Sequence, residues 1–286
     1  MFTRWNLTSR SSAFVMAALA GAAALASTLA TASGTPTPLV DYKAVNYNAI
    51  TGGWTDSSGN GNNATLPNGA TAPTLVANAT PNGSSAVSFV ANYTNPGVYL
   101  DITTGLAPGS GYTVLAFAEP TEAVYLDDNL VGGPVGALAY FIGPTSGTNY
   151  QRLGNGGTTF GVSNTGVPTT AFSMIGVATD NVGNATFYFN GNTDGTTSGS
   201  DAFTSPINLI GAKDSPAGGF FVGNIAELQI YSGVLTANEV QTVNQAFTNA
   251  YINPVPESAP VALIAVAGLG LLLLRRKWSR NIRGTV

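Results

Sequence analysis

Carboxylates are the side chains that could perform acid–base chemistry in this sequence, which contains neither histidine nor cysteine. A glycosidase needs two carboxyl groups flanking the sugar bond, about 5–5.5 Å apart for retention of configuration and about 6.5–9.5 Å apart for inversion. Glu119 and Glu122 are three positions apart, so a regular strand would place them on opposite faces. Asp127 and Asp128 are adjacent and diverge, and Glu227 has no second acidic residue in its strand. The sequence therefore predicts a protein that is not an enzyme, with an unrecognised carboxylate pair as the alternative.

Calcium binding is a second chemistry that the residue types allow. Calcium takes six to eight oxygen ligands from Asp, Asn and backbone carbonyls. Asp56, Asn60 and Asn62 lie within seven residues of one another and could supply such oxygens, and Asp127 and Asp128 form a second group. The first stretch lacks the final glutamate of an EF-hand loop and also fits a run of turns held by Asx side chains. We expect no cofactor other than calcium, and the sequence favours the turn interpretation over a calcium site.

Exposed aromatic side chains beside amides and carboxylates could stack on sugar rings. Five tyrosines lie in or beside polar stretches, namely Tyr93, Tyr99, Tyr125, Tyr140 and Tyr150. The alternative is that these rings pack in the core or at its rim, which is the commoner place for tyrosine. The sequence does not identify which loop would form a sugar site.

The absence of two residue types excludes several classes of site. Without histidine there is no Ser-His-Asp triad, no histidine acid–base catalysis and no histidine-ligated zinc. Without cysteine there are no disulfides, so the hydrophobic core must stabilise the fold alone.

Charge is distributed unevenly along the chain. Residues 33–253 contain three basic and thirteen acidic residues, a formal net charge of −10. Such a surface repels nucleic acid, so we expect no nucleic-acid partner. Charged residues make up 8% of the whole chain, compared with about 25% in typical soluble domains. Asn, Gly, Thr and Ser replace them and give a surface that is uncharged but rich in hydrogen-bonding groups.

The central part reads as many short strands separated by turns. Its segments are rich in β-branched and aromatic residues and are bounded by Gly, Asn, Pro or Asp. The predicted strands are Ala86–Val90, Val98–Ile102, Tyr112–Glu119, Gly136–Ile142, Thr158–Val162, Phe172–Thr179, Ala185–Asn190, Ile207–Ile210 and Phe220–Tyr231. So many strands at this spacing predict an all-β sandwich or jelly roll in one large domain, residues 33–253.

One helix is predicted, from Ala237 to about Ala250. Thr236 is a good N-cap, and Glu239 three residues later completes a capping box. Val240, Val243 and Phe247 form an apolar stripe at helical spacing. We therefore expect this helix to lie on the sandwich.

Residues 1–32 have the organisation of a secretory signal peptide. Arg4 and Arg10 form its positive start, and an apolar stretch follows from Phe14 to Leu29. Ala30 and Ala32 provide the small residues of an A-x-A cleavage site. The sequence therefore predicts an exported protein, with a retained membrane anchor as the alternative.

The last part of the chain, residues 254–286, has three pieces in a fixed order. A short motif, Val255-Pro256-Glu257, precedes an apolar segment at 261–274 and a basic cluster, Arg275-Arg276-Lys277. The apolar segment would span roughly 21 Å as a helix, and the basic cluster would keep its end in the cytoplasm. The alternative is a buried terminal helix.

This tail resembles the PEP-CTERM sorting signal of envelope proteins, with Ser258 where that signal has its second proline. The resemblance implies transient anchoring in the inner membrane and cleavage by an exosortase-type processing enzyme near Pro256 and Glu257. It also implies a final location in the cell envelope or outside the cell, in association with exopolysaccharide.

Three stretches of the domain resemble the LamG-like jelly rolls, within the concanavalin-like sandwiches. They are Trp54–Ala64, Tyr112–Pro120 and Phe221–Tyr231, the last followed by a turn and the capped helix. The resemblance implies binding of carbohydrate or protein partners, sometimes with calcium. We therefore expect a non-catalytic binding module. A carbohydrate-active enzyme on the same fold and a purely structural surface protein are the alternatives.

Overall fold

The computed structural model describes residues 34–89, 97–107, 109–121, 128–133, 139–145, 147–155, 158–199, 205–213 and 219–254. The chain divides into two units, residues 1–37 and 38–286, and only residues 34–37 of the first unit are described. The predicted signal peptide and the apolar segment 261–274 lie outside these ranges. Within the described ranges, no helix has both the length and the apolar composition needed to cross a membrane.

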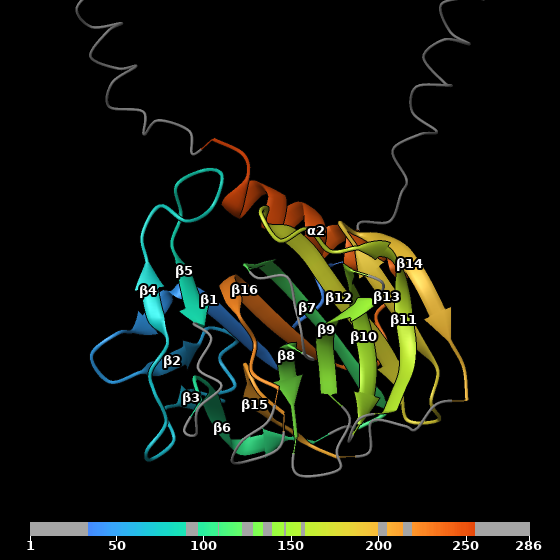
Figure 1. Ribbon diagram of the computed structural model, residues 1–286, viewed down its shortest axis with the longest axis horizontal. Coiled ribbons are helices and arrows are strands. Elements are labelled where there is room, and N and C mark those ends of the chain that lie inside the picture. Colours follow the sequence, from blue (N-terminus) through green and yellow to red (C-terminus); the bar gives the residue numbers. More distant parts are fainter. Residues whose placement is uncertain are drawn as a thin grey trace, which may run out of the picture. The chain divides into compact units, whose positions relative to one another are not determined.

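The described part of the second unit consists of sixteen strands and one helix, α2, Ala237–Tyr251 (Figure 1). The strands are β1 Val40–Asn48, β2 Gly53–Asp56, β3 Ala64–Thr65, β4 Thr74–Val76, β5 Ala86–Phe89, β6 Leu100–Leu106, β7 Gly111–Pro120, β8 Asp128–Gly132, β9 Ala139–Thr145, β10 Thr148–Asn155, β11 Thr158–Gly166, β12 Ser173–Asp180, β13 Ala185–Phe189, β14 Asn192–Thr197, β15 Ile207–Ile210 and β16 Gly223–Ser232.

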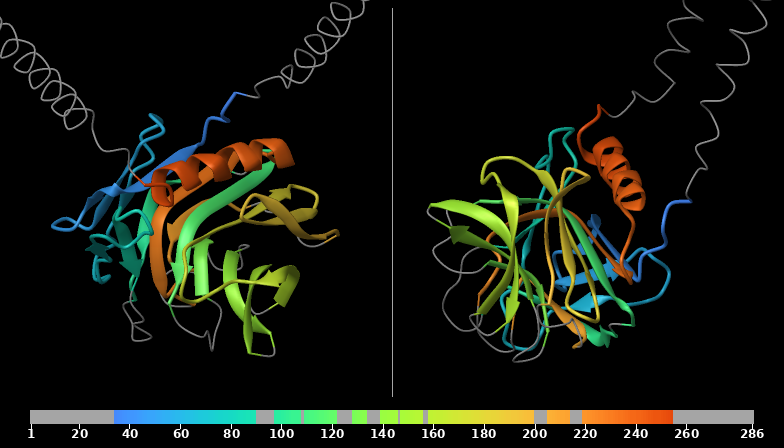
Figure 2. Two further views of the ribbon diagram at one scale, coloured as in Figure 1. Left: turned by 90° about the horizontal axis from the view of Figure 1, so that it is seen from above. Right: turned by 90° about the vertical axis from the view of Figure 1, so that its right-hand side faces the viewer.

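These strands form a strongly curved sheet that folds over on itself into two layers (Figures 1 and 2). The strand order is β11-β10-β9-β8-β15-β6-β3-β2-β1-β16-β7-β12-β13-β14, and every strand pairing in it is antiparallel. The two ends approach each other, because the Thr197 hydroxyl in β14 donates to the Phe160 carbonyl in β11, 3.1 Å away. The predicted all-β sandwich is confirmed, in a form close to a barrel.

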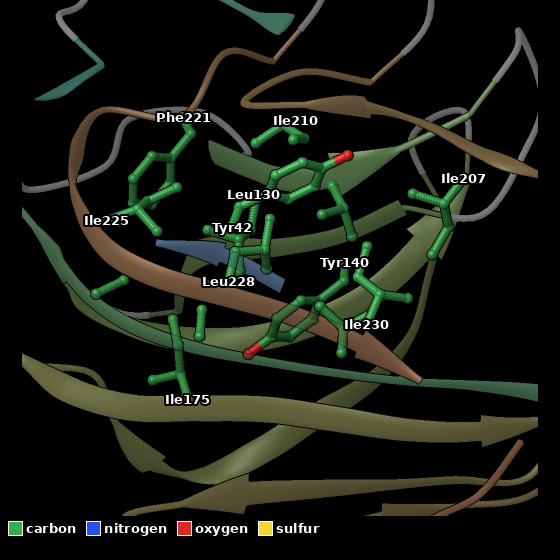
Figure 3. Packing of buried hydrophobic residues seen from close by; sticks show 14 of the residues in the cluster. Tyr42, Leu130, Tyr140, Ile175, Ile207, Ile210, Phe221, Ile225, Leu228 and Ile230 are labelled. Atoms are coloured by element: carbon green, nitrogen blue, oxygen red, sulfur yellow. The ribbon is translucent and has the colours of Figure 1, made fainter. Parts of the chain in front are cut away.

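The main core lies between the two layers. Ile225, Leu228 and Ile230 of β16 face Leu130 of β8 and Tyr140 of β9 across it (Figure 3). Alternate positions of a strand point to opposite faces, so one side of each strand fills this core.

A second apolar layer forms between the sheet and α2. Leu115 and Phe117 of β7 point to this side and meet Val240, Val243 and Phe247 of the helix. Because both faces of β7 are covered, its sequence is a nearly continuous apolar run and does not alternate between apolar and polar residues.

The helix begins as predicted. The Thr236 hydroxyl accepts a hydrogen bond from the Glu239 amide at 3.3 Å, and the Glu239 carboxylate accepts one from the Thr236 amide at 2.8 Å. Asn82, in the loop between β4 and β5, binds the other end of the helix through the carbonyl of Ala250, 2.8 Å from its amide nitrogen. The β4–β5 loop therefore supplies a hydrogen-bond donor to the last turn of the helix.

Candidate functional site

Two carboxylates far apart in the sequence lie on neighbouring strands. Asp41 is in β1 and Glu227 is in β16, where the antiparallel register pairs Lys43 with Glu227 and Asp41 with Gln229. A register shift between Ile225 and Glu227 of β16 opposite β7 accompanies this arrangement. The sequence correctly shows that Glu227 has no acidic neighbour in its own strand; its neighbour comes from β1.

The side chains around Glu227 hold both of its oxygens. Tyr251, the last residue of α2, donates its hydroxyl to Oε2 at 2.6 Å, and the Gln229 amide donates to Oε1 at 2.5 Å. Tyr231 donates in turn to Oε1 of the Gln229 side chain. Lys43 Nζ lies 3.0 Å from Asp41 Oδ2. This cluster connects β1, β16 and α2.

Burial and charge change the acidity of the cluster. Burial and the nearby Asp41 charge raise the pKa of Glu227 to about 7. Burial lowers the pKa of Lys43, but its hydrogen bond to Asp41 and the charges of Glu227 and Asp41 outweigh this, so the pKa is raised. Glu227 thus retains its proton near neutral pH far more than an exposed glutamate does.

The carboxylate pair is enclosed by the fold. Glu227 is 4% exposed and Asp41 is 7% exposed, and both oxygens of Glu227 are bonded to protein side chains. A glycosidase pair must flank a substrate that enters from solvent. The geometry therefore suits attachment of α2 to the sheet, and it does not present two carboxyls across an open groove. Of the other candidates, Glu119 accepts a 3.0 Å hydrogen bond from Asn224, Asp128 is buried in β8, and Glu122 lies outside the described residues.

The predicted calcium stretch forms a tight loop around Asp56. Oδ1 of Asp56 accepts hydrogen bonds from the amides of Asp41 and Ser58 at 2.9 and 2.8 Å. Oδ2 accepts from the Ser58 hydroxyl at 2.8 Å and from the Asn62 amide at 3.0 Å. The side-chain amides of Asn60 and Asn62 each donate to the Leu39 carbonyl at 3.0 Å. Four donors of the chain thus surround this carboxylate, as the turn interpretation expects.

The second predicted calcium group is in another part of the fold. Asp128 is a buried residue of β8, and three strands separate β8 from β2, which carries Asp56. Asp127 lies outside the described residues. No group of three or more Asp or Glu side chains suited to a metal ion occurs within the described ranges. Calcium binding stays a prediction.

Two of the five tyrosines considered for stacking on sugar, Tyr99 and Tyr140, are buried. Tyr140 is 0% exposed, and its hydroxyl donates to Oε1 of Gln151 at 2.6 Å. The same oxygen also accepts a hydrogen bond from the Gly176 amide. Tyr99 is 7% exposed and stacks on Phe220, with ring centroids 6.1 Å apart. The sequence analysis favoured packing in the core or at its rim for these tyrosines, and Tyr99 and Tyr140 pack in this way. Tyr150 is half-buried, and Tyr93 and Tyr125 lie outside the described residues.

An exposed polar surface instead forms where β3 pairs with β6. We call it the β3–β6 polar face and define it by Asn62, Thr65, Asp101, Thr103 and Thr104. The register pairs Thr65 with Asp101, while their neighbours Ala64 and Ile102 point into the core. Thr65 and Thr103 hydroxyls lie 3.3 Å apart, and Thr104 donates to Asn62 Oδ1 at 3.3 Å.

This face offers uncharged hydrogen-bonding groups and one carboxylate. Thr65, Thr103 and Thr104 are exposed, and Asp101 and Asn62 are half-buried. Burial raises the pKa of Asp101, whose backbone pairs with Thr65 of β3 on one side and with Leu209 of β15 on the other. Hydroxyl and amide groups can donate and accept, so the face offers both functions to a ligand. Sequence reasoning missed it because β3 has two residues and no strand pattern of its own.

The sequence of the domain is similar to a known protein family. The sequence model of the concanavalin A-like lectin/glucanases superfamily matches residues 93–241. That range contains the second and third of the resembling stretches, and the first, Trp54–Ala64, precedes it. No curated protein matches the sequence.

Solved structures share the fold at low identity. Domain 4 of AbnA, a GH43 extracellular arabinanase from Geobacillus stearothermophilus solved with arabinotriose, is 18% identical with a TM-score of 0.53, covering 74% of this chain and 100% of that domain. The binding domain of Paraclostridial Mosquitocidal Protein 1 is 14% identical with a TM-score of 0.51, covering 74% of this chain and 53% of that one. A Trypanosoma rangeli sialidase mutant displaying trans-sialidase activity is 11% identical with a TM-score of 0.53, covering 78% and 35%. At these identities the likeness concerns the fold alone.

Proposed function

We propose that this chain, which belongs to the concanavalin A-like lectin/glucanases superfamily, is a non-catalytic binding module for a neutral carbohydrate. The observation that carries the proposal is the β3–β6 polar face, where the exposed Thr65 and Thr103 lie beside Asp101. A sugar presents hydroxyls that both donate and accept, and a carboxylate beside hydroxyls and an amide complements them.

Two further observations support binding over catalysis, and two others support a neutral carbohydrate as the ligand. The enclosed pair Asp41 and Glu227 is engaged in holding α2, and Asp56 is bonded to its own loop. The similarity to domain 4 of the arabinanase, which this chain covers along its whole length and which was solved with arabinotriose, supports a carbohydrate as the ligand. The net charge of −10 over residues 33–253 favours a neutral glycan over an acidic one.

A glycan array on the full chain in mild detergent, with and without calcium, tests this function. We expect binding to a neutral oligosaccharide, and a calcium requirement would identify the metal site that the sequence allows. Asp101→Ala and Thr103→Val should each weaken that binding by about tenfold, because each removes a hydrogen bond to the ligand. Thr196→Val is the matched control, since Thr196 is an exposed strand threonine in β14. Binding that is absent, or equal in all variants, contradicts the proposal.

We further propose that the chain is exported and sorted to the envelope or extracellular matrix, on the evidence of its termini. The segment 261–274 would hold the chain in the inner membrane until a processing enzyme of the exosortase type cuts near Glu257. Glu257→Ala should then leave uncleaved protein in the membrane fraction, and Ser258→Ala provides a control for a change outside the Pro-Glu pair. Mass spectrometry of the released protein decides the question, because a released form that still contains Trp278 rules out this sorting.

A further inference from the structure

A line of side chains crosses five neighbouring strands of the sheet (Figure 1). Its members are Thr74 of β4, Ser88 of β5, Asn224 of β16, Glu119 of β7 and Phe172, the residue before β12. The antiparallel registers pair each of the first four members with the next one. Ser173 pairs with Ala118, so Phe172 comes opposite Glu119. We call these five residues the cross-strand row.

The row lies just beyond the end of α2, on the face of the sheet that this helix covers. The helix begins beside Thr113 of β7 and ends beside Phe117, whose ring stacks on Tyr251 with centroids 5.4 Å apart. Glu119 is the next residue of β7 on that face, because alternate residues of a strand share a face. Phe172 also stacks on Phe117, again with centroids 5.4 Å apart. This stacking fixes the Phe172 ring beside the carboxylate of Glu119.

The polar side chains of the row have atoms available to a ligand. The Asn224 amide donates to Oε2 of Glu119 at 3.0 Å, and within the described ranges the side chains of the row make no other hydrogen bond. Thr74 is exposed, and the other four members are half-buried. None of their unbonded oxygen atoms is among the buried, unpartnered atoms of the described chain, so these oxygens reach solvent.

The position of the row excludes a peptide that binds by adding a strand. The strands β5, β16 and β7 each have a partner strand on both sides, so the row offers side chains and no open backbone edge.

The chemistry and length of the row match a neutral glycan chain. Hydroxyl, amide and carboxylate groups donate to and accept from sugar hydroxyls, and the Phe172 ring adds apolar contact. The Glu119 carboxylate and the net charge of −10 over residues 33–253 repel an anionic ligand. Neighbouring strands lie about 4.8 Å apart, so four steps between strands make the row roughly 19 Å long. That length suits several consecutive units of an extended chain.

We propose that the cross-strand row is a second glycan-binding site, which holds a neutral polysaccharide chain across the strands. It is separate from the β3–β6 polar face, because β2 and β1 lie between β3 and β16 in the sheet. With both sites occupied, one copy of the protein joins two polysaccharide chains. This joining rests on the function proposed for the polar face, whereas binding at the row does not.

Affinity electrophoresis of the full chain in mild detergent tests the row. The native gels contain arabinan, dextran, mixed-linkage β-glucan or galactomannan, and we expect at least one of them to retard the wild type. Thr74→Val combined with Glu119→Gln should raise the dissociation constant for that polysaccharide about tenfold or more, because two hydrogen-bonding groups and one of two attachment points are lost.

Two controls accompany this double variant. Glu119→Gln keeps a side-chain oxygen for Asn224, and an unchanged urea midpoint shows that the fold is intact. Thr196→Val is the matched control for Thr74→Val, because both residues are exposed threonines of a strand, and it should leave the dissociation constant unchanged.

The outcomes separate the row from the polar face. Asp101→Ala combined with Thr103→Val should leave part of the retardation, and all four changes together should abolish it. A row variant that binds as tightly as the wild type overturns the second site and leaves the polar face standing. Binding that is lost with the row variant and unchanged with the Asp101 variant supports the row and overturns the function proposed for the polar face. A wild type that no gel retards overturns both.

Viscosity measures the joining of chains. Added to a solution of the bound polysaccharide, the wild type should raise the viscosity, and each double variant should raise it much less, because a protein with one site holds one chain. A row variant that raises the viscosity as much as the wild type overturns this part of the proposal.

Discussion

Glu227 shows how a single residue changes its chemistry when the chain folds. In sequence it is an ordinary glutamate in an apolar strand, and in the structure it is a buried acid held by Tyr251 and Gln229 beside Asp41. Desolvation disfavours its charged form, and the nearby Asp41 charge disfavours it further. The residue therefore links the stability of the fold to pH.

The direction of that linkage follows from the pKa of Glu227, which rises from its usual 4.5 to about 7 in the fold. The folded protein binds this proton more tightly than the unfolded chain does. The stabilising contribution is therefore fully present below about pH 4.5 and is lost as the pH rises through about 7, and it amounts to at most about 3 kcal/mol.

Glu227→Gln should remove this dependence, because glutamine cannot ionise. The free energy of unfolding of the variant minus that of the wild type should increase by up to about 3 kcal/mol between pH 4.5 and pH 8. Chemical denaturation at several pH values measures it. Tyr251→Phe is a useful comparison, since it removes one hydrogen bond and keeps the ionisable carboxyl. A difference that stays constant with pH would show that Glu227 titrates normally.

Asp56 is predicted to be essential to its loop. Its carboxylate accepts four hydrogen bonds from chain donors, so Asp56→Ala leaves the buried amide of Asp41 and the half-buried amides of Ser58 and Asn62 without this acceptor. We expect a loss of about 2–4 kcal/mol in the free energy of unfolding, measured by urea denaturation. Asn60→Ala, at an exposed position of the same loop, should cost much less. Equal effects of the two changes would argue against this role for Asp56.

At the scale of elements, α2 connects the sequence pattern most directly to the structure. The predicted helix, its cap at Thr236 and its buried stripe of Val240, Val243 and Phe247 are all confirmed. Local signals are sufficient here, because a capping box and a 3.6-residue period depend on residues within a few positions of one another.

Thr236→Ala should lower the free energy of unfolding by roughly 0.5–2 kcal/mol, because the Glu239 amide loses its acceptor. Thr242→Ala is the control within the same helix: Thr242 is half-buried, its hydroxyl donates only to the carbonyl of Asn238 in its own helix, and alanine favours a helix interior. Thermal and chemical denaturation should both show that the Thr236→Ala variant is less stable than the Thr242→Ala variant. The opposite order would show that the cap does not contribute.

The strands were predicted less completely. Ile207–Ile210 agrees with β15 at both ends, and in β13 Phe187 and Tyr188 lie on opposite faces, as the alternation of side chains along a strand requires. The pattern missed β1–β4, β8, β10 and β14. These strands are short, or polar, or covered on both faces, so a period of two residues does not stand out in them.

At the scale of the whole molecule, the acidic domain and the two terminal segments together predict an exported protein. If the signal peptide is cut after Ala32, N-terminal sequencing of the exported form should begin at Ser33, because Ala30 and Ala32 satisfy the requirement for small residues. Replacing Ala32 with a bulky residue should move or block the cut. An exported protein that retains Met1 would contradict this interpretation.

The sequence by itself determined the fold class, the helix and the exclusion of histidine and cysteine chemistry. These depend on composition and on patterns within a few residues. Tertiary structure decided which residues share a site. Asp41 and Glu227 are 186 positions apart, and the β1–β16 register brings them together. The same holds for Thr65 and Asp101 on the polar face, and for the burial of Tyr140. A strand pattern shows which residues share a face, but only the pairing and layering of strands determine what lies beside that face and what covers it.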